Sequence, residues 1–147
     1  MSMVSARRFA REIALQGIYQ RLLSGNEATS IEAQFIDNKN FNRADQAFCA
    51  GLFRDVVAHQ AELDELLAPH THRALTEISP VEHSILLLAC HEMKNHPETP
   101  YRVIINEAIE LAKRYGGTTG HRFINGVLDK LATHLRDVEL NMPAQEK

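Results

Sequence analysis

The sequence predicts an all-α protein, and three observations support this class. Strand-like alternation of apolar and polar residues is absent over any useful length. Residues that start a helix recur along the chain, and glycines stand where several helices should end. The length of 147 residues fits about one domain. We therefore expect one all-helical domain over residues 1–137, followed by a disordered tail at 138–147.

Apolar spacing and the start and stop signals place six helices. The third should break near His59. The fourth contains SILLLACHEM, residues 84–93, which is apolar nearly all round and should form the central buried helix. The expected helices span residues 5–24, 30–38, 43–68, 80–95, 100–115 and 119–135.

Capping side chains mark the helix starts. Two stretches match the capping box, in which a hydroxyl accepts a hydrogen bond from the third amide of the helix: Thr29-x-x-Glu32 and Ser79-Pro80-Val81-Glu82. Pro80 suits the first helical position, where its missing N–H costs nothing. Similar starts are Asn42 with Asp45, Thr99 with Pro100, and Thr118 or Thr119 for the last helix.

Glycines mark two helix ends and also lie inside helices. Gly25-Asn26 follows IYQRLLS and Gly116-Gly117 follows AKRY, where a left-handed cap is expected. An interior glycine costs up to about 1 kcal/mol relative to alanine. Either a second helix approaches too closely for a Cβ, or the glycine is simply tolerated. The interior glycines are Gly17, Gly51 and Gly126.

Asn125-Gly126 is also the strongest short signal for a β-hairpin turn. A hairpin would place Val127 and Leu128 on opposite faces of a strand that has no alternating partner. A helix instead gathers the apolar residues on one face, so a helix is predicted. These residues are Phe123, Ile124, Val127, Leu128, Leu131 and Leu135.

Charge is unevenly distributed behind a net charge of −3. Residues 1–21 carry +3 and residues 102–136 carry +3, whereas residues 27–98 hold twelve acids against five bases. If the two basic segments meet in space, they form a patch suited to a phosphate backbone, and the acidic middle suits a basic protein partner. A solvated surface with chance asymmetry explains the same pattern.

Several functional classes find no support. His91 and His96 in HEMKNH are five residues apart, not four as on a zinc-protease helix, and no other spacing completes a metal site. YGGTTG lacks the strand and the Lys-Ser/Thr of a phosphate loop. No apolar run approaches a membrane span, and no secretory signal is visible. Cys49 and Cys90 should be buried free thiols in a reducing cytoplasm. We therefore expect no enzyme, metal or cofactor.

The stretch KRYGGTTGHRF, residues 113–123, carries bases and interleaved aromatics without an acid. Cations that neutralise phosphates, together with ring faces that stack on bases, are what single-stranded RNA requires. The alternative is that Tyr115 and Phe123 are core residues and the cations are solvated.

Four stretches of this chain resemble the NusB family of bacterial transcription antitermination factors. The first is an arginine-rich start, ARRFAREIALQGIYQ (6–20). The others are GLFRDVVAHQAELDELLAPH (51–70), VEHSILLLACHEM (81–93) and PYRVIINEAIELAKRYGGTTGHRFINGVLDKL (100–131). The resemblance implies two packed three-helix bundles and binding without catalysis. It implies that the chain, with the ribosomal protein NusE, binds boxA-type nascent RNA within the RNA polymerase antitermination complex and promotes read-through, notably of ribosomal RNA operons.

The resemblance also implies site residues. Two departures from the family pattern are Phe9, which interrupts the arginine run, and Gly-Thr-Thr-Gly before His121, where many relatives have acids; the second should raise RNA affinity modestly. The expected partner-binding residues are Glu77 and Glu82. The expected RNA-binding residues are Arg7, Arg8, Arg11, Arg122 and Phe123, with Tyr19 and Arg114 as weaker candidates.

Two other classes remain as rivals. A NusB-like domain begins some RNA methyltransferases, but no methyl-donor Rossmann segment is visible here. A helical protein–protein adaptor without direct RNA binding is the second, and salt-dependent RNA binding would distinguish it from an RNA-binding factor.

Overall fold

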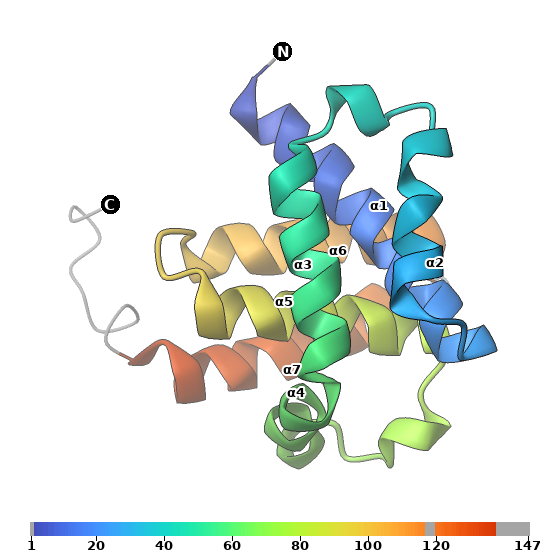
Figure 1. The fold of residues 1–147 in the computed structure, drawn as a ribbon. Helices are drawn as coiled ribbons and strands as arrows, with labels where there is room; N and C mark the ends of the chain where they lie inside the picture. Colours follow the sequence, from blue (N-terminus) through green and yellow to red (C-terminus); the bar gives the residue numbers. More distant parts are fainter. Residues whose placement is uncertain (1, 117–119, 138–147) are drawn as a thin grey trace.

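The computed structural model describes residues 2–116 and 120–137, and in these residues every regular element is helical (Figure 1). The all-α prediction is confirmed. Short 3₁₀ turns lie at Phe35–Asp37, Phe41–Arg43, Ala68–His70 and Leu75–Glu77. The α-helices are α1 (Met3–Ser24), α2 (Ala28–Ala33), α3 (Gln46–Ala58), α4 (Gln60–Leu67), α5 (Pro80–Asn95), α6 (Tyr101–Tyr115) and α7 (Gly120–Leu135).

The helices form two packed three-helix bundles, as expected. Helices α1, α2 and α3 contact one another, and so do α5, α6 and α7. Helix α5 also contacts α1 and α3, so it joins the bundles, while α4 packs on α5 and α7 at one end of the molecule (Figure 1). A single contiguous core of buried side chains runs through both bundles.

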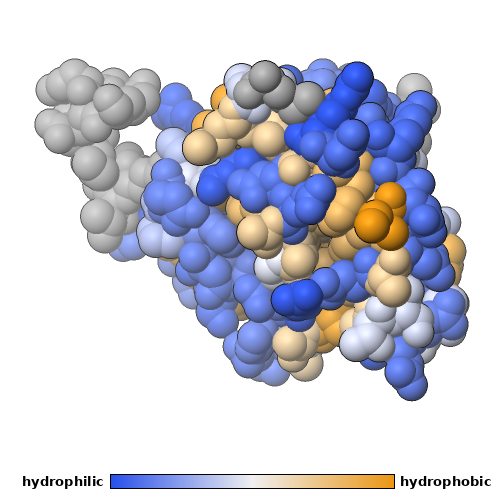
Figure 2. Space-filling view, turned by 45° about the horizontal axis from the view of Figure 1, so that its top comes forward, coloured by the Kyte–Doolittle hydropathy of each residue, from blue (hydrophilic) through white to orange (hydrophobic). Residues whose placement is uncertain are grey.

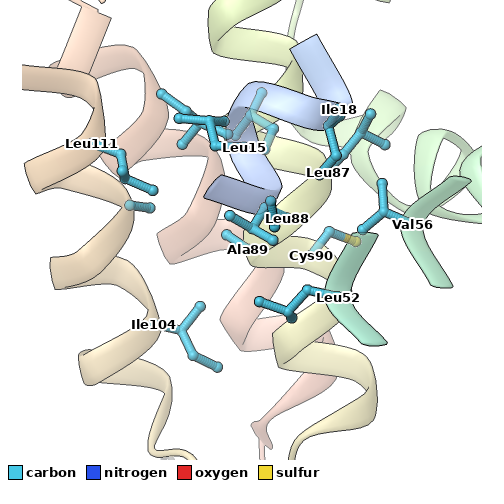
Figure 3. Close-up of a cluster of buried hydrophobic side chains, with 14 of the residues drawn as sticks. Leu15, Ile18, Leu52, Val56, Leu87, Leu88, Ala89, Cys90, Ile104 and Leu111 are labelled. Carbon is cyan, nitrogen blue, oxygen red and sulfur yellow. The ribbon is translucent and has the colours of Figure 1, made fainter. Parts of the chain in front are cut away.

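Helix α5 is the central buried helix. Every residue from Ser84 to Met93 is buried, which confirms the prediction from the apolar run at 84–93. Figure 3 shows Leu87, Leu88, Ala89 and Cys90 of α5 surrounded by side chains from the neighbouring helices. These neighbours are Leu15 and Ile18 of α1, Leu52 and Val56 of α3, and Ile104 and Leu111 of α6.

Some capping predictions are confirmed. Ser79 Oγ accepts a hydrogen bond from the Glu82 amide at the start of α5. The start expected at Asn42 is wrong: α3 begins at Gln46, and Asp45 is its N-cap and accepts a hydrogen bond from the Phe48 amide. Gly25 ends α1 in the left-handed region, with φ of 69°. The break at His59 between α3 and α4 is also confirmed.

Other boundary predictions are wrong. Helix α2 begins before Thr29, after Glu27, and ends at Ala33. The chain then turns so that Phe35 reaches the core, where its ring lies 5.2 Å from that of Phe53. Pro100 precedes the first residue of α6, and Gly116 ends α6 in extended rather than left-handed backbone. The expected roles of Gly117, Thr118, Thr119 and the tail at 138–147 lie outside the described residues.

The helical reading of Asn125-Gly126 is confirmed, because both lie inside α7. The close-approach explanation holds only for Gly17, where an added Cβ would lie 2.9 Å from the Phe35 ring and 3.0 Å from the Phe53 ring. At Gly51 and Gly126 an added Cβ would meet nothing within 4 Å, so close packing explains neither.

Candidate nucleic-acid interface

A groove of about 860 Å³ lies between α1 and α6. Both helices contribute charged side chains to it, with Arg8 from α1 and Lys113 and Arg114 from α6 as its exposed bases. The acids in the same lining are Glu12, Glu107 and Glu110. The groove therefore brings part of the basic segment 1–21 against part of the basic segment 102–136.

Carboxylates beneath the arginines hold them at the rim of this groove. Arg8 Nε lies 3.0 Å from Glu107 Oε2; the Arg8 side chain is 61% exposed and that of Glu107 only 12%. Arg114 pairs in the same way with Glu12. Each pairing leaves further guanidinium N–H groups of an exposed side chain available to solvent. The acids orient the cations and also lower the net positive charge of the groove.

A second hollow of about 340 Å³ shares Glu12 and Arg114 with the groove and is also lined by Tyr115. The Tyr115 hydroxyl donates a hydrogen bond to Glu12 Oε2 at 2.8 Å. Burial and then this carboxylate raise the pKa of Tyr115 above its ordinary value. The ring remains 38% exposed, so one aromatic group is fixed beside the basic rim. The expected set omitted Tyr115, although its place between Arg114 and a glycine was visible.

Arg7 lies against α3 and does not project freely. Its guanidinium carbon is 4.3 Å from the centre of the Phe48 ring, and its Nε is 3.9 Å from Asp45 Oδ2. This arrangement gives Arg7 a packing contact as well as a charge. It stands at the end of the molecule where α5 leads into the loop containing His96 and Glu98.

Arg11 is buried, with 5% of its surface exposed. Its Nε lies 2.7 Å from Glu92 Oε2 and a terminal nitrogen lies 2.8 Å from Glu92 Oε1, a bidentate pair in the core between α1 and α5. Arg11 lines the floor of the groove, but its side chain is only 6% exposed and its guanidinium is occupied by Glu92. The structure therefore assigns Arg11 a role in the fold, contrary to its expected place among surface RNA contacts.

Arg122 and Phe123 lie in the first turn of α7. Arg122 is exposed, whereas Phe123 is half-buried against the core. The Arg73 guanidinium carbon lies 4.3 Å from the centre of the Phe123 ring, so a cation already stacks on this aromatic. Phe123 is therefore neither fully buried nor fully exposed, and its proposed contact with RNA stays a prediction. Arg73 was not among the expected residues, because fifty residues separate it from its partner.

The structure places the expected RNA residues at two ends of α5 rather than in one cluster. Arg7 lies by the loop after α5, while Phe123 contacts Arg73, just before α5 begins. The 16 residues of α5 span about 24 Å. The groove is lined on α1 by residues between Ser5 and Glu12. Tyr19 is half-buried and lies farther along α1, beyond these residues.

Glu77 and Glu82, the expected partner-binding residues, both flank the start of α5. Glu77 is exposed, and its carboxylate accepts a hydrogen bond from the Ala74 amide. Glu82 is half-buried, and its Oε2 lies 2.7 Å from where a Cβ on Gly120 would stand. A carboxylate at the N-terminus of α7 complements the helix dipole. Glu77 is therefore the more accessible of the two acids.

Both cysteines are buried in the core. Burial raises the pKa of Cys49 and of Cys90 to about 12, and both thiols are free, as expected. Among the described residues, no group of three His, Cys, Asp or Glu side chains is arranged to hold a metal ion. None of the helices in residues 2–116 and 120–137 is long and apolar enough to cross a membrane.

On the face shown in Figure 2, hydrophilic and hydrophobic residues are interspersed, so a ligand lying on it meets charged and apolar groups together.

The chain matches the model of the NusB family over residues 8–133. This chain belongs to the NusB family. The resemblance seen in the four sequence stretches is thereby confirmed.

Curated relatives in the NusB family cover nearly the whole chain. Transcription antitermination protein NusB of Aromatoleum aromaticum is 57% identical over 141 residues, which cover 96% of this chain and 97% of the relative. The protein of the same name from an Azoarcus species is 51% identical over 148 residues, covering 100% of this chain and 96% of the relative.

Solved structures agree with the fold. NusB from T. maritima has a TM-score of 0.80 at 25% identity, over 92% of this chain and 97% of that chain. A crystal structure of the antitermination factors NusB and NusE in complex with dsRNA has a TM-score of 0.79 at 22% identity, over 86% of this chain and 96% of that chain. The second likeness concerns the fold alone.

Proposed function

We propose that this NusB-family chain is an RNA-binding transcription antitermination factor. With NusE it binds boxA-type single-stranded nascent RNA in the cytoplasm and promotes read-through by RNA polymerase, notably of ribosomal RNA operons. The observation that carries this proposal is the 57% identity, over nearly all of both chains, to a protein described as a transcription antitermination protein. The factor acts by binding and performs no catalysis.

The proposed RNA path follows the groove between α1 and α6 and then turns onto α7. Arg8 and Arg114 stand at the rim with free N–H groups, and Arg122 is exposed beyond the end of α6. Tyr19, Tyr115 and Phe123 supply aromatic surface along the same route. Exposed cations with partly exposed rings are the combination that binds a single strand, because phosphates and base faces are recognised together. Arg7 contributes charge at the start of the path.

The proposed NusE surface includes the acidic side chains at the start of α5. Glu77 is exposed there and Glu82 is partly exposed. Residues 27–98 hold twelve acids against five bases, so this part of the chain attracts a basic partner. Ribosomal proteins are basic because they bind RNA, which makes NusE suited to this surface.

Arg8→Ala and Arg122→Ala are expected to weaken RNA binding without changing helicity. For a single strand, each phosphate contact removed should flatten the log–log dependence of the binding constant on salt by about 0.7. The measurement is fluorescence anisotropy of a labelled boxA-type RNA at four potassium chloride concentrations. Arg54→Ala is the matched control, because Arg54 is also an exposed arginine paired with a glutamate, Glu32, but lies on α3 and does not line the groove.

Equal salt slopes for the wild type and both variants would contradict the proposed path. RNA binding by none of these proteins, together with retained binding of NusE, would favour the adaptor without direct RNA binding. Circular dichroism on each preparation excludes unfolding as the cause of any loss.

A further inference from the structure

A cluster of three histidines and a lysine lies where the turn after α4 meets α7, outside the groove. Lys130 Nζ lies 2.7 Å from His72 Nε2. The rings of His70 and His134 have centroids 6.2 Å apart, with their planes at 65°. The two pairs join segments about sixty residues apart, so the sequence pattern gave no sign of this cluster.

The cluster continues the strip that begins at Phe123. Lys130 and His134 follow Phe123 by seven and eleven residues, and at 100° per residue all three lie within about 20° of one line along α7. Arg73 stacks on the Phe123 ring, and its neighbour His72 contacts Lys130. One edge of α7 therefore carries Phe123, Lys130 and His134 in order. Arg73 and His72, from the turn after α4, lie against this edge.

The backbone of the turn after α4 has an unusual conformation at His72, the residue that contacts Lys130 of α7. His72 has φ of 58°, and it is the one non-glycine residue with positive φ among those described. The left-handed region is uncommon for a residue with a side chain. In this conformation the His72 Nε2 atom lies 2.7 Å from Lys130 Nζ.

The groups that face His70 are all basic. They are His72 from its own turn and Lys130 and His134 from α7; burial first, and then these neighbours, lower the pKa of His70. The nearest acid of α7, Asp129, lies about 100° around the helix from Lys130. His70 Nε2 is buried without a hydrogen-bond partner among the described residues. The groups that act on His70 therefore include no negative charge.

We propose that His70, His72, Lys130 and His134 form a binding site for a phosphate of the RNA backbone, and that protonation of the histidines regulates binding there. This site extends the proposed RNA surface along α7 and so rests on the proposed function. A phosphate oxygen would accept from Lys130 Nζ and from the exposed rings of His72 and His134, each of which is a donor or can become one.

The direction of the pH effect follows from the charges. In the structure, Lys130 donates to His72, which requires the His72 nitrogen to be unprotonated. Burial and then the neighbouring bases lower the pKa of His70. An anion bound beside these groups acts in the opposite direction, because it favours the protonated form. Phosphate binding therefore takes up protons, and affinity for RNA rises as the pH falls through the range in which histidine titrates.

The test is the affinity for a labelled boxA-type RNA at pH 8 and pH 6, at constant ionic strength in phosphate-free buffer. The wild type should bind at least about threefold more tightly at pH 6, since each proton taken up can contribute up to tenfold per pH unit. His70→Gln combined with His134→Gln should lose most of this gain. His59→Gln, exposed at the break between α3 and α4, should keep it. His121→Gln measures any contribution from the histidine beside Arg122.

Lys130→Gln provides a second variant at an exposed position, in case the histidine substitutions disturb folding. It should weaken RNA binding at both pH values and most at pH 6. An unchanged pH gain in both the double variant and Lys130→Gln overturns the site. If RNA binding at pH 8 still depends on Arg8 and Arg122, the proposed function survives that result; if RNA binds at neither pH, both fail.

Inorganic phosphate distinguishes the two sources of the ligand. Millimolar phosphate should displace RNA no more than potassium chloride of equal ionic strength, because the strand is held at several points. Full displacement by phosphate in the wild type, absent in the double variant, would identify a free-phosphate site and overturn the assignment to RNA.

Discussion

Arg11→Ala is expected to lower the free energy of unfolding by about 3–5 kcal/mol, since it leaves a buried carboxylate unpaired. Arg11 and Glu92 form two hydrogen bonds of 2.7 and 2.8 Å, and their side chains are 6% and 2% exposed. Glu107 Oε1 lies 3.8 Å from the same guanidinium. Removing the arginine therefore leaves the Glu92 carboxylate in the core without a cation, whereas Glu107 keeps Arg8 at 3.0 Å.

Urea unfolding followed by circular dichroism measures this loss. The double substitution Arg11→Met with Glu92→Met is the control, because apolar residues of similar size remove both charges and should recover most of the stability. A loss below about 1 kcal/mol for Arg11→Ala would mean that the pair is not buried in solution. RNA affinity per folded molecule should be unchanged in the double variant, which separates Arg11 from the surface arginines.

Arg136→Ala is expected to lower the free energy of unfolding by about 3 kcal/mol, because buried carbonyls lose a charged donor. Arg136 is buried and donates to the Met93 and Thr99 carbonyls at 2.9 and 3.0 Å. It also donates to the carbonyls of His96 and Glu92. The last carbonyls of a helix have no partner within it, so this one side chain caps the end of α5.

Thermal unfolding tests the role of Arg136. A loss of about 3 kcal/mol corresponds to a fall in Tm of roughly 6–12 °C for a chain of this size. Arg136→Lys keeps the charge but not the planar fork of donors, so it should recover less than half of the loss. A melting temperature within about 2 °C of the wild type for Arg136→Ala would show that water replaces these bonds at little cost.

The helices and the central position of α5 could be predicted because their signals are local. The apolar run at 84–93 fixes the buried helix, and Ser79 and Asp45 form caps that the residues next in sequence complete. The 3₁₀ turns after α2 could not be predicted, since they exist because Phe35 packs against Phe53, which belongs to another helix. The two explanations for Gly126 could not be separated for the same reason, because only the structure shows that nothing lies within 4 Å of an added Cβ there.

The candidate site was predicted in part. The charge distribution identified residues 1–21 and 102–136 as basic, and helices α1 and α6 from these two segments do line one groove. Arg11 was placed among the RNA-binding residues because the family resemblance implied it, although it shares a helical face with the buried Ala14 and Ile18. Glu92, the single acid in the apolar run, was the second signal that a buried pair existed. The histidine cluster had no such signal, because its members meet only through the contact of the turn after α4 with α7.

The affinity for a boxA-type single-stranded RNA, measured with and without NusE at two salt concentrations, tests the central claim most directly. Phosphate contacts by Arg8, Arg114 and Arg122 predict a log–log salt slope of about −2 for the chain alone. NusE should tighten binding at both salt concentrations, because a second protein adds contacts to the same strand. Binding that shows no salt dependence, or no specific binding in either the presence or the absence of NusE, would contradict the assignment of this chain as an RNA-binding antitermination factor.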